Sequence, residues 1–215
     1  MVEAVFFDLD GTLADTAPDL GYALNLVRRQ RGLEPLALEI VRPYASHGAR
    51  GLLEIGLGLT PAAPDFGDTR QEFLAFYERY LCHHTTLFPG IGELLTGLEE
   101  RGIPWGVVTN KPARYTDPLM EQLGLTQRAV CIVSGDTCAN SKPHPEPMLY
   151  ACSSAGVEPH RSLYLGDAER DIEAARAAGM PALVALYGYL DATDRPEDWQ
   201  AAGSVATPLE VLNHL

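Results

Sequence analysis

After residue 88 the chain alternates short apolar runs with longer amphipathic stretches. The apolar runs predict buried strands, and the amphipathic stretches, each followed by or ending in a glycine, predict helices that end there. The expected strands are 104–110, 129–135, 162–167 and 181–188, with a last short strand near Val205. The expected helices are 90–102, 112–124, 145–156 and 168–179. Short buried strands that alternate with helices predict a parallel sheet with helices on both faces.

The N-terminal part of the chain has a different pattern. Ala4–Phe7 is apolar throughout and predicts a further buried strand, whereas residues 15–84 show helical patterns only. In that segment we expect helices over Pro18–Arg31 and Thr69–Leu81, and helical turns interrupted by glycines over Leu38–Leu59. The sequence therefore predicts the α/β class, with a Rossmann-like core formed by residues 1–14 and 85–215 and an all-helical cap inserted at 15–84.

Composition narrows the choice of partner and compartment. The formal net charge of −13 argues against nucleic acid and anionic membranes, because both attract basic surfaces. No apolar stretch approaches the roughly 20 residues that span a bilayer, and the N-terminus lacks the basic region of a signal peptide. The four cysteines show no metal-ligand spacing and are expected to be unpaired thiols. We expect a cytoplasmic protein, a monomer or a homodimer, that binds a small metabolite.

Polar residues that could do chemistry stand where the predicted strands end. In open parallel sheets the carboxyl ends of the strands form the edge at which ligands bind. Segments far apart in the sequence should therefore bring their side chains to one rim. The segments are Asp8-Leu9-Asp10-Gly11-Thr12, Thr109-Asn110, Ser141-Lys142 and Gly166-Asp167, with Asp171 one turn into the following helix.

These residue types match the needs of phosphoryl transfer. A carboxylate such as Asp8 can attack phosphorus, and Asp10, two residues on, would share its face on a regular strand. Gly11 allows a sharp turn that brings its amide near the phosphate. A metal ion and local basic side chains would answer the need of an acidic protein for positive charge at an anionic substrate.

The remaining candidates supply that charge and the hydrogen bonds. Lys142 offers a point charge and Thr109 a hydroxyl to the phosphoryl oxygens. Asp8 and Asp167 form an oxygen-rich site suited to Mg²⁺. Further candidates for phosphate or substrate binding are Thr12, Asn110 and Lys111 in the core and Ser46, Gly48 and Arg50 in the cap.

Taken one at a time, several of these residues have plainer explanations. Thr109-Asn110 could be a turn between a strand and a helix, and Lys142 a solvated lysine before a helix. Asp171 could simply favour a helix N-terminus. The cap segment Ser46–Arg50 either faces the substrate or starts a helix with a solvated arginine. The joint placement of the core residues on one rim favours the chemical explanation.

Four segments, in chain order, resemble the motifs of the haloacid dehalogenase-like phosphatases: VFFDLDGTLADT, VVTNK, SKPHPEP and LGDAERDIEAARAAGM. The resemblance implies that Asp8 is nucleophile and metal ligand, and that Asp10 is general acid and then base, with its backbone carbonyl also at the metal. It further implies that Thr109 and Lys142 hold the phosphoryl group and that Asn110 orients the phosphate or the neighbouring loop. Asp167 would bind Mg²⁺ directly, and Asp171 would support it directly or through water.

Within that family the chain resembles the phosphoglycolate phosphatase group, and LFPGIGELL, WGVVTNKP, MEQLGL and ALYGYLDATDRPEDW resemble bacterial N-acetylmuramic acid 6-phosphate phosphatases. The expected activity is Mg²⁺-dependent hydrolysis of a small phosphate monoester, N-acetylmuramic acid 6-phosphate or 2-phosphoglycolate. A sugar phosphomutase of the same fold, similar to β-phosphoglucomutase, would keep the same motifs. A non-catalytic phospho-acceptor or binding module is a further alternative, whereas a dehalogenase would not need Asp10.

Overall fold

A computed structural model describes all residues from 1 to 215, and the chain divides into two compact units. The first unit comprises residues 1–14 and 87–215, and the second comprises residues 15–86. The chain connects the two units twice, through the short strands β2 (Ala14–Asp15) and β3 (Thr86–Leu87). These two strands pair with each other as a two-stranded sheet. The second unit therefore ends at this paired strand, two residues beyond the 15–84 limits expected for the cap.

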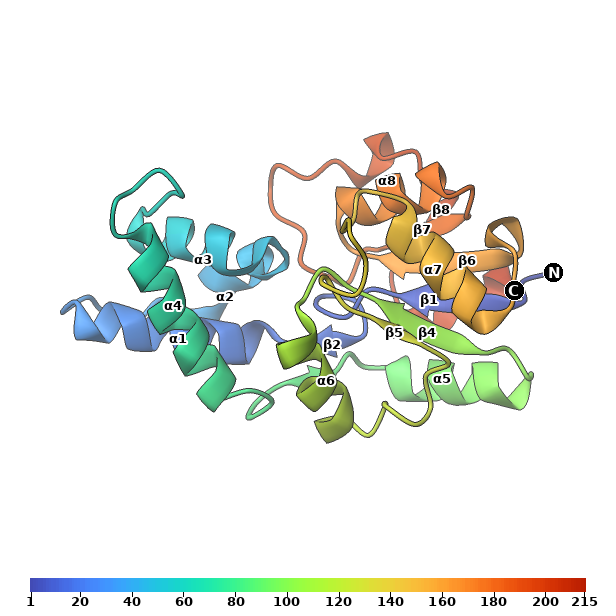
Figure 1. The fold of residues 1–215 in the computed structure, drawn as a ribbon, viewed down its shortest axis with the longest axis horizontal. Helices are drawn as coiled ribbons and strands as arrows, with labels where there is room; N and C mark the ends of the chain where they lie inside the picture. Colours follow the sequence, from blue (N-terminus) through green and yellow to red (C-terminus); the bar gives the residue numbers. More distant parts are fainter. The chain divides into compact units, whose positions relative to one another are not determined.

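The first unit is built on a six-stranded parallel sheet in the order β5-β4-β1-β6-β7-β8 (Figure 1). The strands are β1 (Ala4–Phe7), β4 (Trp105–Val108), β5 (Ile132–Val133), β6 (Ser162–Gly166), β7 (Ala182–Ala185) and β8 (Gly203–Val205). From β1 the chain builds the sheet first toward β4 and β5, and then toward β6, β7 and β8. The strand order thus reverses beside β1, which is where open parallel sheets bind their ligands.

Helices cover both faces of this sheet, as the sequence predicted. α7 (Glu146–Ala155) and α8 (Glu169–Ala177) lie on one face, and α5 (Ile91–Glu100) and α6 (Ala113–Gln122) lie on the other (Figure 1). All four helices occupy the predicted segments with slightly shorter ends. The core under α7 and α8 contains the fully buried side chains of Phe6, Val108, Tyr164, Met148 and Ile172. Short 3₁₀ helices follow at Pro159–Arg161, Pro196–Asp198 and Pro208–His214.

The second unit consists of helices between its two linking strands. They are α1 (Ala17–Gln30), α2 (Leu38–Val41), the 3₁₀ helix η1 (Arg42–His47), α3 (Gly48–Leu57) and α4 (Phe66–Arg79). The stretch from Leu38 breaks into three pieces because Pro43 lacks a backbone N–H and Gly48 adopts a φ of +60°. Leu24, Leu52, Leu53, Phe73 and Tyr77 form its buried interior.

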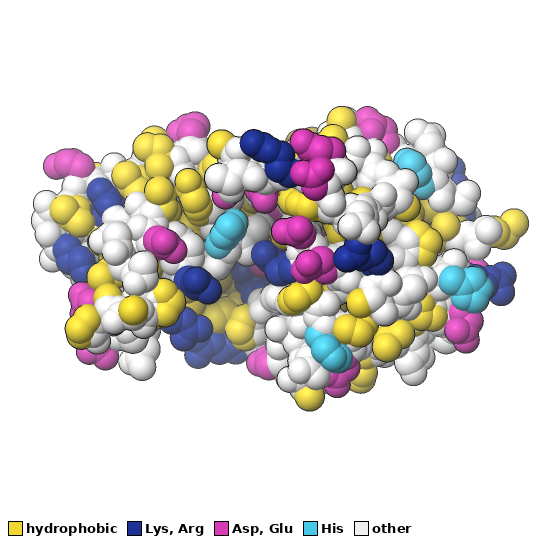
Figure 2. All heavy atoms as spheres, turned by 90° about the horizontal axis from the view of Figure 1, so that it is seen from above, with side chains coloured by type: hydrophobic (Ala, Val, Ile, Leu, Met, Phe, Trp, Pro, Cys, Tyr) yellow, Lys and Arg dark blue, Asp and Glu magenta, His cyan; other side chains and the backbone are white.

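Charged side chains of both signs lie at the surface. On the face shown in Figure 2, acidic and basic side chains are interspersed. Among the helices, none is both long enough and apolar enough to cross a membrane.

Candidate active site

Asp8 begins the loop that follows β1, and its side chain is almost completely buried. The Asp8 amide donates to the carbonyl of Leu165 on the neighbouring β6 (2.9 Å), and the Leu9 amide donates to Asp8 Oδ1 (2.8 Å). The chain then turns, and Asp10 forms an isolated bridge with Ala14. Because β1 ends at Phe7, Asp8 and Asp10 do not lie on a regular strand, and the expectation that they share one strand face is wrong.

Lys142 is buried between the ends of β1, β4 and β6. Its Nζ lies 3.0 Å from Asp8 Oδ1 and 2.6 Å from Asp171 Oδ1, the latter an ion pair rather than a well-directed hydrogen bond. The same ammonium donates to the carbonyl of Val108 and to the hydroxyl of Tyr164, each at 2.8 Å. An ammonium surrounded in this way is held in one position.

Asn110 fixes the backbone of Lys142. Its Nδ2 donates to the Lys142 carbonyl (2.9 Å), and its Oδ1 accepts from the Lys142 amide (3.0 Å). The side chain therefore links the loop after β4 to the loop that carries Lys142. A role for Asn110 in orienting the phosphate stays a prediction.

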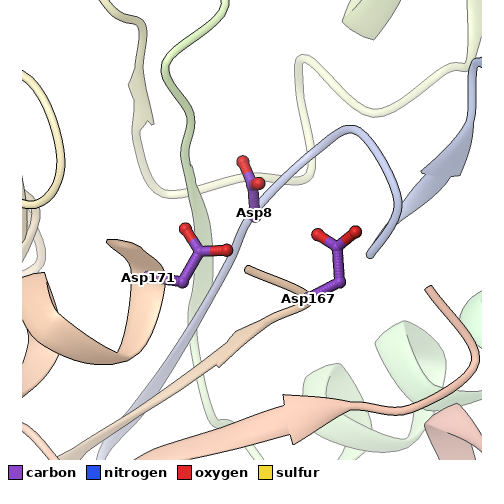
Figure 3. A group of neighbouring side chains, drawn as sticks. All are labelled: Asp8, Asp167 and Asp171. Atoms are coloured by element: carbon purple, nitrogen blue, oxygen red, sulfur yellow. The ribbon is translucent and has the colours of Figure 1, made fainter. Parts of the chain in front are cut away.

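Three carboxylates converge at this edge of the sheet. Asp8, Asp167 and Asp171 each offer an oxygen, and these oxygens lie within 4.8 Å of one another (Figure 3). They come from the end of β1, the end of β6 and the first turn of α8. Asp171 Oδ2 also accepts the amide of Ala168 (3.0 Å), which fixes this carboxylate at the start of the helix.

The electrostatics of the cluster favour a bound cation. Burial raises the pKa of Asp171, an effect that Lys142 opposes and Asp8 reinforces. Burial lowers the pKa of the neighbouring Arg170, but the surrounding aspartates outweigh it and the net shift is upward. Three buried carboxylates with converging oxygens suit a hard divalent ion such as Mg²⁺, which prefers oxygen ligands. The residues present thus fit a metal site.

Asp167 is enclosed by the loops around it. The Thr12 hydroxyl donates to its Oδ1 (3.2 Å), and the Tyr189 amide donates to its Oδ2 (2.9 Å). Gly11 has a φ of +83°, and a Cβ there would overlap the Asp167 carboxylate. A Cβ at Gly188 would overlap the same side chain, so both loops pack against it with backbone alone.

The remaining core candidates lie on the loop after β4. Thr109 is buried, and its Oγ1 accepts the amide of Lys111 (3.2 Å). The Lys111 Nζ lies 2.8 Å from Asp10 Oδ1. The structure thus places Lys111, a candidate for phosphate or substrate binding, in an ion pair with the expected general acid.

The cap candidates belong to the second unit. Ser46 lies in η1, Gly48 begins α3, and Arg50 is exposed in the first turn of that helix. Their contact with substrate stays a prediction.

Sequence reasoning missed Tyr164 and Arg170. Tyr164 stands between Leu163 and Leu165 on the buried strand Ser162–Gly166, and a phenol on a buried strand needs a hydrogen-bond partner. That signal could have pointed to a polar site nearby. Burial raises the pKa of Tyr164 well above its usual value, so its hydroxyl keeps its proton and donates to the Val108 carbonyl (2.7 Å).

The fold and this constellation have known counterparts. A family model described as haloacid dehalogenase-like hydrolase matches residues 5–185. The chain belongs to the haloacid dehalogenase-like hydrolases.

Several relatives above 40% identity are named as phosphatases. An N-acetylmuramic acid 6-phosphate phosphatase from Pseudomonas aeruginosa is 42% identical over 214 residues, which is 100% of this chain and 95% of that protein. A phosphoglycolate phosphatase from Xanthomonas campestris pv. campestris is 44% identical over 205 residues, covering 95% and 92%. The solved structure of a predicted phosphoglycolate phosphatase from Haemophilus somnus superposes with a TM-score of 0.86 at 26% identity, covering 99% and 97%. The chain is thus a phosphatase of this family, a phosphoric monoester hydrolase, as the motifs predicted.

Proposed function

We propose that the chain hydrolyses a small phosphate monoester by way of a phosphorylated Asp8. The observation that carries the proposal is the meeting of Asp8, Lys142 and Asp171 at the carboxyl edge of the sheet, with ion-pair distances of 3.0 and 2.6 Å. In the first half-reaction an Asp8 oxygen bonds to phosphorus, the bond from phosphorus to the ester oxygen breaks, and Asp10 gives that oxygen a proton. In the second, Asp10 takes a proton from water, whose oxygen attacks the aspartyl phosphate and releases Asp8 and inorganic phosphate.

The neighbouring residues orient the phosphoryl group. Lys142 presents a positive charge from a fixed position, and Thr109 and Thr12 bring hydroxyls to the same edge. Gly11 and Asn110 shape the loops that carry these groups. Preset positions of this kind lower the barrier because no reorganisation is needed during the reaction.

A bound Mg²⁺ is part of this proposal. Asp8, Asp167 and Asp171 would hold it, together with the backbone carbonyl of Asp10 that the family resemblance implies. When bound, the ion supplies positive charge to the phosphoryl oxygens.

The substrate we propose is N-acetylmuramic acid 6-phosphate or 2-phosphoglycolate. The names of two relatives above 40% identity support these choices. Both compounds are phosphate esters of a primary alcohol and also carry a carboxylate. The helical unit, with Ser46, Gly48 and Arg50, is proposed to select between them.

Replacing the nucleophile tests the mechanism. Asp8→Asn should lower phosphate release by at least about a thousandfold, because an amide cannot form the aspartyl phosphate. Its circular dichroism should match that of the wild type. Activity near that of the wild type would exclude Asp8 as the nucleophile. Assays on both candidate esters should measure free phosphate, and the assay on N-acetylmuramic acid 6-phosphate should also measure isomer formation, because isomerisation without net phosphate release would indicate a mutase.

A further inference from the structure

The sequence contains two lysines, and both lie in the site. The other fourteen of its sixteen basic side chains are arginines. The side chains of Lys111 and Lys142 are 8% and 0% exposed. The proposed phosphoryl site accounts for Lys142, whereas the role of Lys111 follows from a different set of contacts.

The backbone of Lys111 is anchored on several sides. Its amide donates to Thr109 Oγ1 (3.2 Å), and its carbonyl accepts from the Gly135 amide (2.9 Å) and the Thr116 hydroxyl (3.0 Å). The loops approach so closely that a Cβ at Gly135 would overlap the backbone carbonyl of Asn110. The Lys111 ammonium therefore extends from a rigid base.

Asp10, by contrast, lies on a turn rather than on a strand. Its residue forms one isolated bridge, to Ala14, and its side chain is 15% exposed. The Asp10 carboxyl must still be aimed at the oxygen of the departing alcohol, since general acid catalysis requires hydrogen-bond reach. A 2.8 Å pair between Lys111 Nζ and Asp10 Oδ1 spans the two loops.

We infer that Lys111 is a positioning residue for Asp10, holding its carboxyl in the direction needed for proton transfer to and from the ester oxygen. This inference rests on the proposed function. It differs from a role in binding substrate, in which Lys111 would leave Asp10 and contact the phosphate or the substrate carboxylate directly. Positioning Asp10, binding the phosphate and binding the substrate carboxylate predict different changes in kcat/KM over a series of esters.

The experiment compares Lys111→Met with the wild type on three esters. They are 2-phosphoglycolate, its analogue 2-hydroxyethyl phosphate with a hydroxymethyl group in place of the carboxylate, and p-nitrophenyl phosphate, whose leaving group needs no proton. We expect kcat/KM to fall about tenfold to a hundredfold for both alkyl esters and by less than about threefold for the aryl ester. The inhibition constant of inorganic phosphate should stay within about twofold.

Other patterns would overturn the inference. A uniform fall over all three esters with weaker phosphate inhibition would assign Lys111 to the phosphate, and a fall for 2-phosphoglycolate alone would assign it to the carboxylate. An unchanged kcat/KM for every ester would leave it no role. Wild-type protein that released phosphate from none of these esters, nor from N-acetylmuramic acid 6-phosphate, would instead refute the proposed function, and the inference with it.

Two controls separate positioning from damage to the fold. The ratio of alkyl to aryl kcat/KM does not depend on how much protein is correctly folded, so partial unfolding leaves it unchanged. Arg114→Met removes one positive charge from an exposed position on α6, only three residues along the chain, and should leave all three values unchanged. Lys111→Arg keeps the charge and should lose less activity on the alkyl esters than Lys111→Met.

Discussion

Asp167 shows how closely the site is built around single atoms. Its two oxygens accept from Thr12 and Tyr189, which belong to loops on different strands, and glycines bring the backbone against its carboxylate. A proposed metal ligand held in this way keeps its direction because each oxygen already has a partner on the protein. The consequence is that a single added methyl group should disturb it.

Gly11→Ala tests that enclosure. The new Cβ would overlap the Asp167 carboxylate and approach the Tyr189 ring to 2.8 Å, at a φ of +83° that alanine disfavours. We expect activity to fall at least about tenfold and stability to fall by about 1–3 kcal/mol, measured by phosphate release and urea unfolding. Gly92→Ala in α5, where a Cβ has nothing within 4 Å, should keep full activity and stability. Equal behaviour of the two variants would contradict the role given to Gly11.

A second prediction at the scale of single residues concerns Tyr164. Its hydroxyl connects the Lys142 ammonium to the Val108 carbonyl, so Tyr164→Phe removes one of the groups that hold the ammonium. Hydrogen bonds to charged groups contribute about 1.5–3 kcal/mol, which corresponds to a fall in kcat/KM of about tenfold to a hundredfold if the loss is felt in the transition state. Tyr150→Phe, on the exposed side of α7, is the matched control and should have no effect. Steady-state kinetics on one ester suffice, and an unaltered Tyr164→Phe enzyme would show that Lys142 does not need this hydroxyl.

Among the elements, α1 carries an unusual anchor. Asp19, in its first turn, is fully buried and accepts the amides of His84 and Thr85 and the Thr85 hydroxyl. The segment that leads into β3 is thereby fastened to the start of α1. A buried carboxylate satisfied by several donors is costly to alter, because its partners lose their acceptor at the same time.

Asp19→Asn should therefore destabilise the helical unit. The side-chain amide would bring a donor toward groups that are themselves donors, at a cost of about 2–4 kcal/mol. Thermal unfolding followed by circular dichroism measures it. Asp68 occupies the corresponding first-turn position of α4 but is exposed, so Asp68→Asn should shift the midpoint little. Similar shifts in the two variants would show that helix position, and not the buried anchor, determines the loss.

The helices and strands also show which parts of the fold could be predicted from the sequence. The helices of the first unit were predictable because their periodicity is strong and a glycine follows each of them. The edge strand β5 is shorter than the predicted 129–135, because only Ile132 and Val133 pair with β4. The acids could be placed on one rim by the rule for parallel sheets. The pairs Lys111–Asp10 and Asp19–Thr85 could not, since they join residues 101 and 66 positions apart through side-chain reach alone.

At the scale of the whole molecule, the cluster of Asp8, Asp167 and Asp171 should link the free energy of unfolding to pH and to the proposed metal binding. Burial raises the pKa of Asp171 in the folded protein. From the ordinary aspartate pKa, about 4, up to the raised value, the folded protein binds more protons than the unfolded chain, so stability falls as pH rises. Above the raised pKa, the folded protein bears the full free-energy cost of keeping the buried Asp171 carboxylate ionised. A bound cation would offset this cost, because it interacts with the ionised carboxylate.

Mg²⁺ should therefore stabilise the protein more at about pH 7.5 than at about pH 4, close to the ordinary aspartate pKa, where the raised pKa keeps Asp171 mostly protonated. A concentration a hundred times Kd adds about 2.7 kcal/mol, or roughly 5–10 °C in Tm for a chain of this size. Differential scanning fluorimetry with sodium chloride at matched ionic strength checks the shift, and EDTA should abolish both the shift and the activity. Equal shifts at the two pH values would refute the link to Asp171.

The placement of the two lysines has a practical consequence for chemical labelling. Apart from the terminal amine of Met1, reagents that acylate amines find no well-exposed target and must reach the two buried lysines of the candidate active site to react. Mass spectrometry of acetylated protein should show slow labelling of Lys111, slowed further by vanadate or phosphate. Amine-directed cross-linkers would underestimate any oligomer, whereas the same chemistry would report occupancy of the catalytic centre without an assay of turnover.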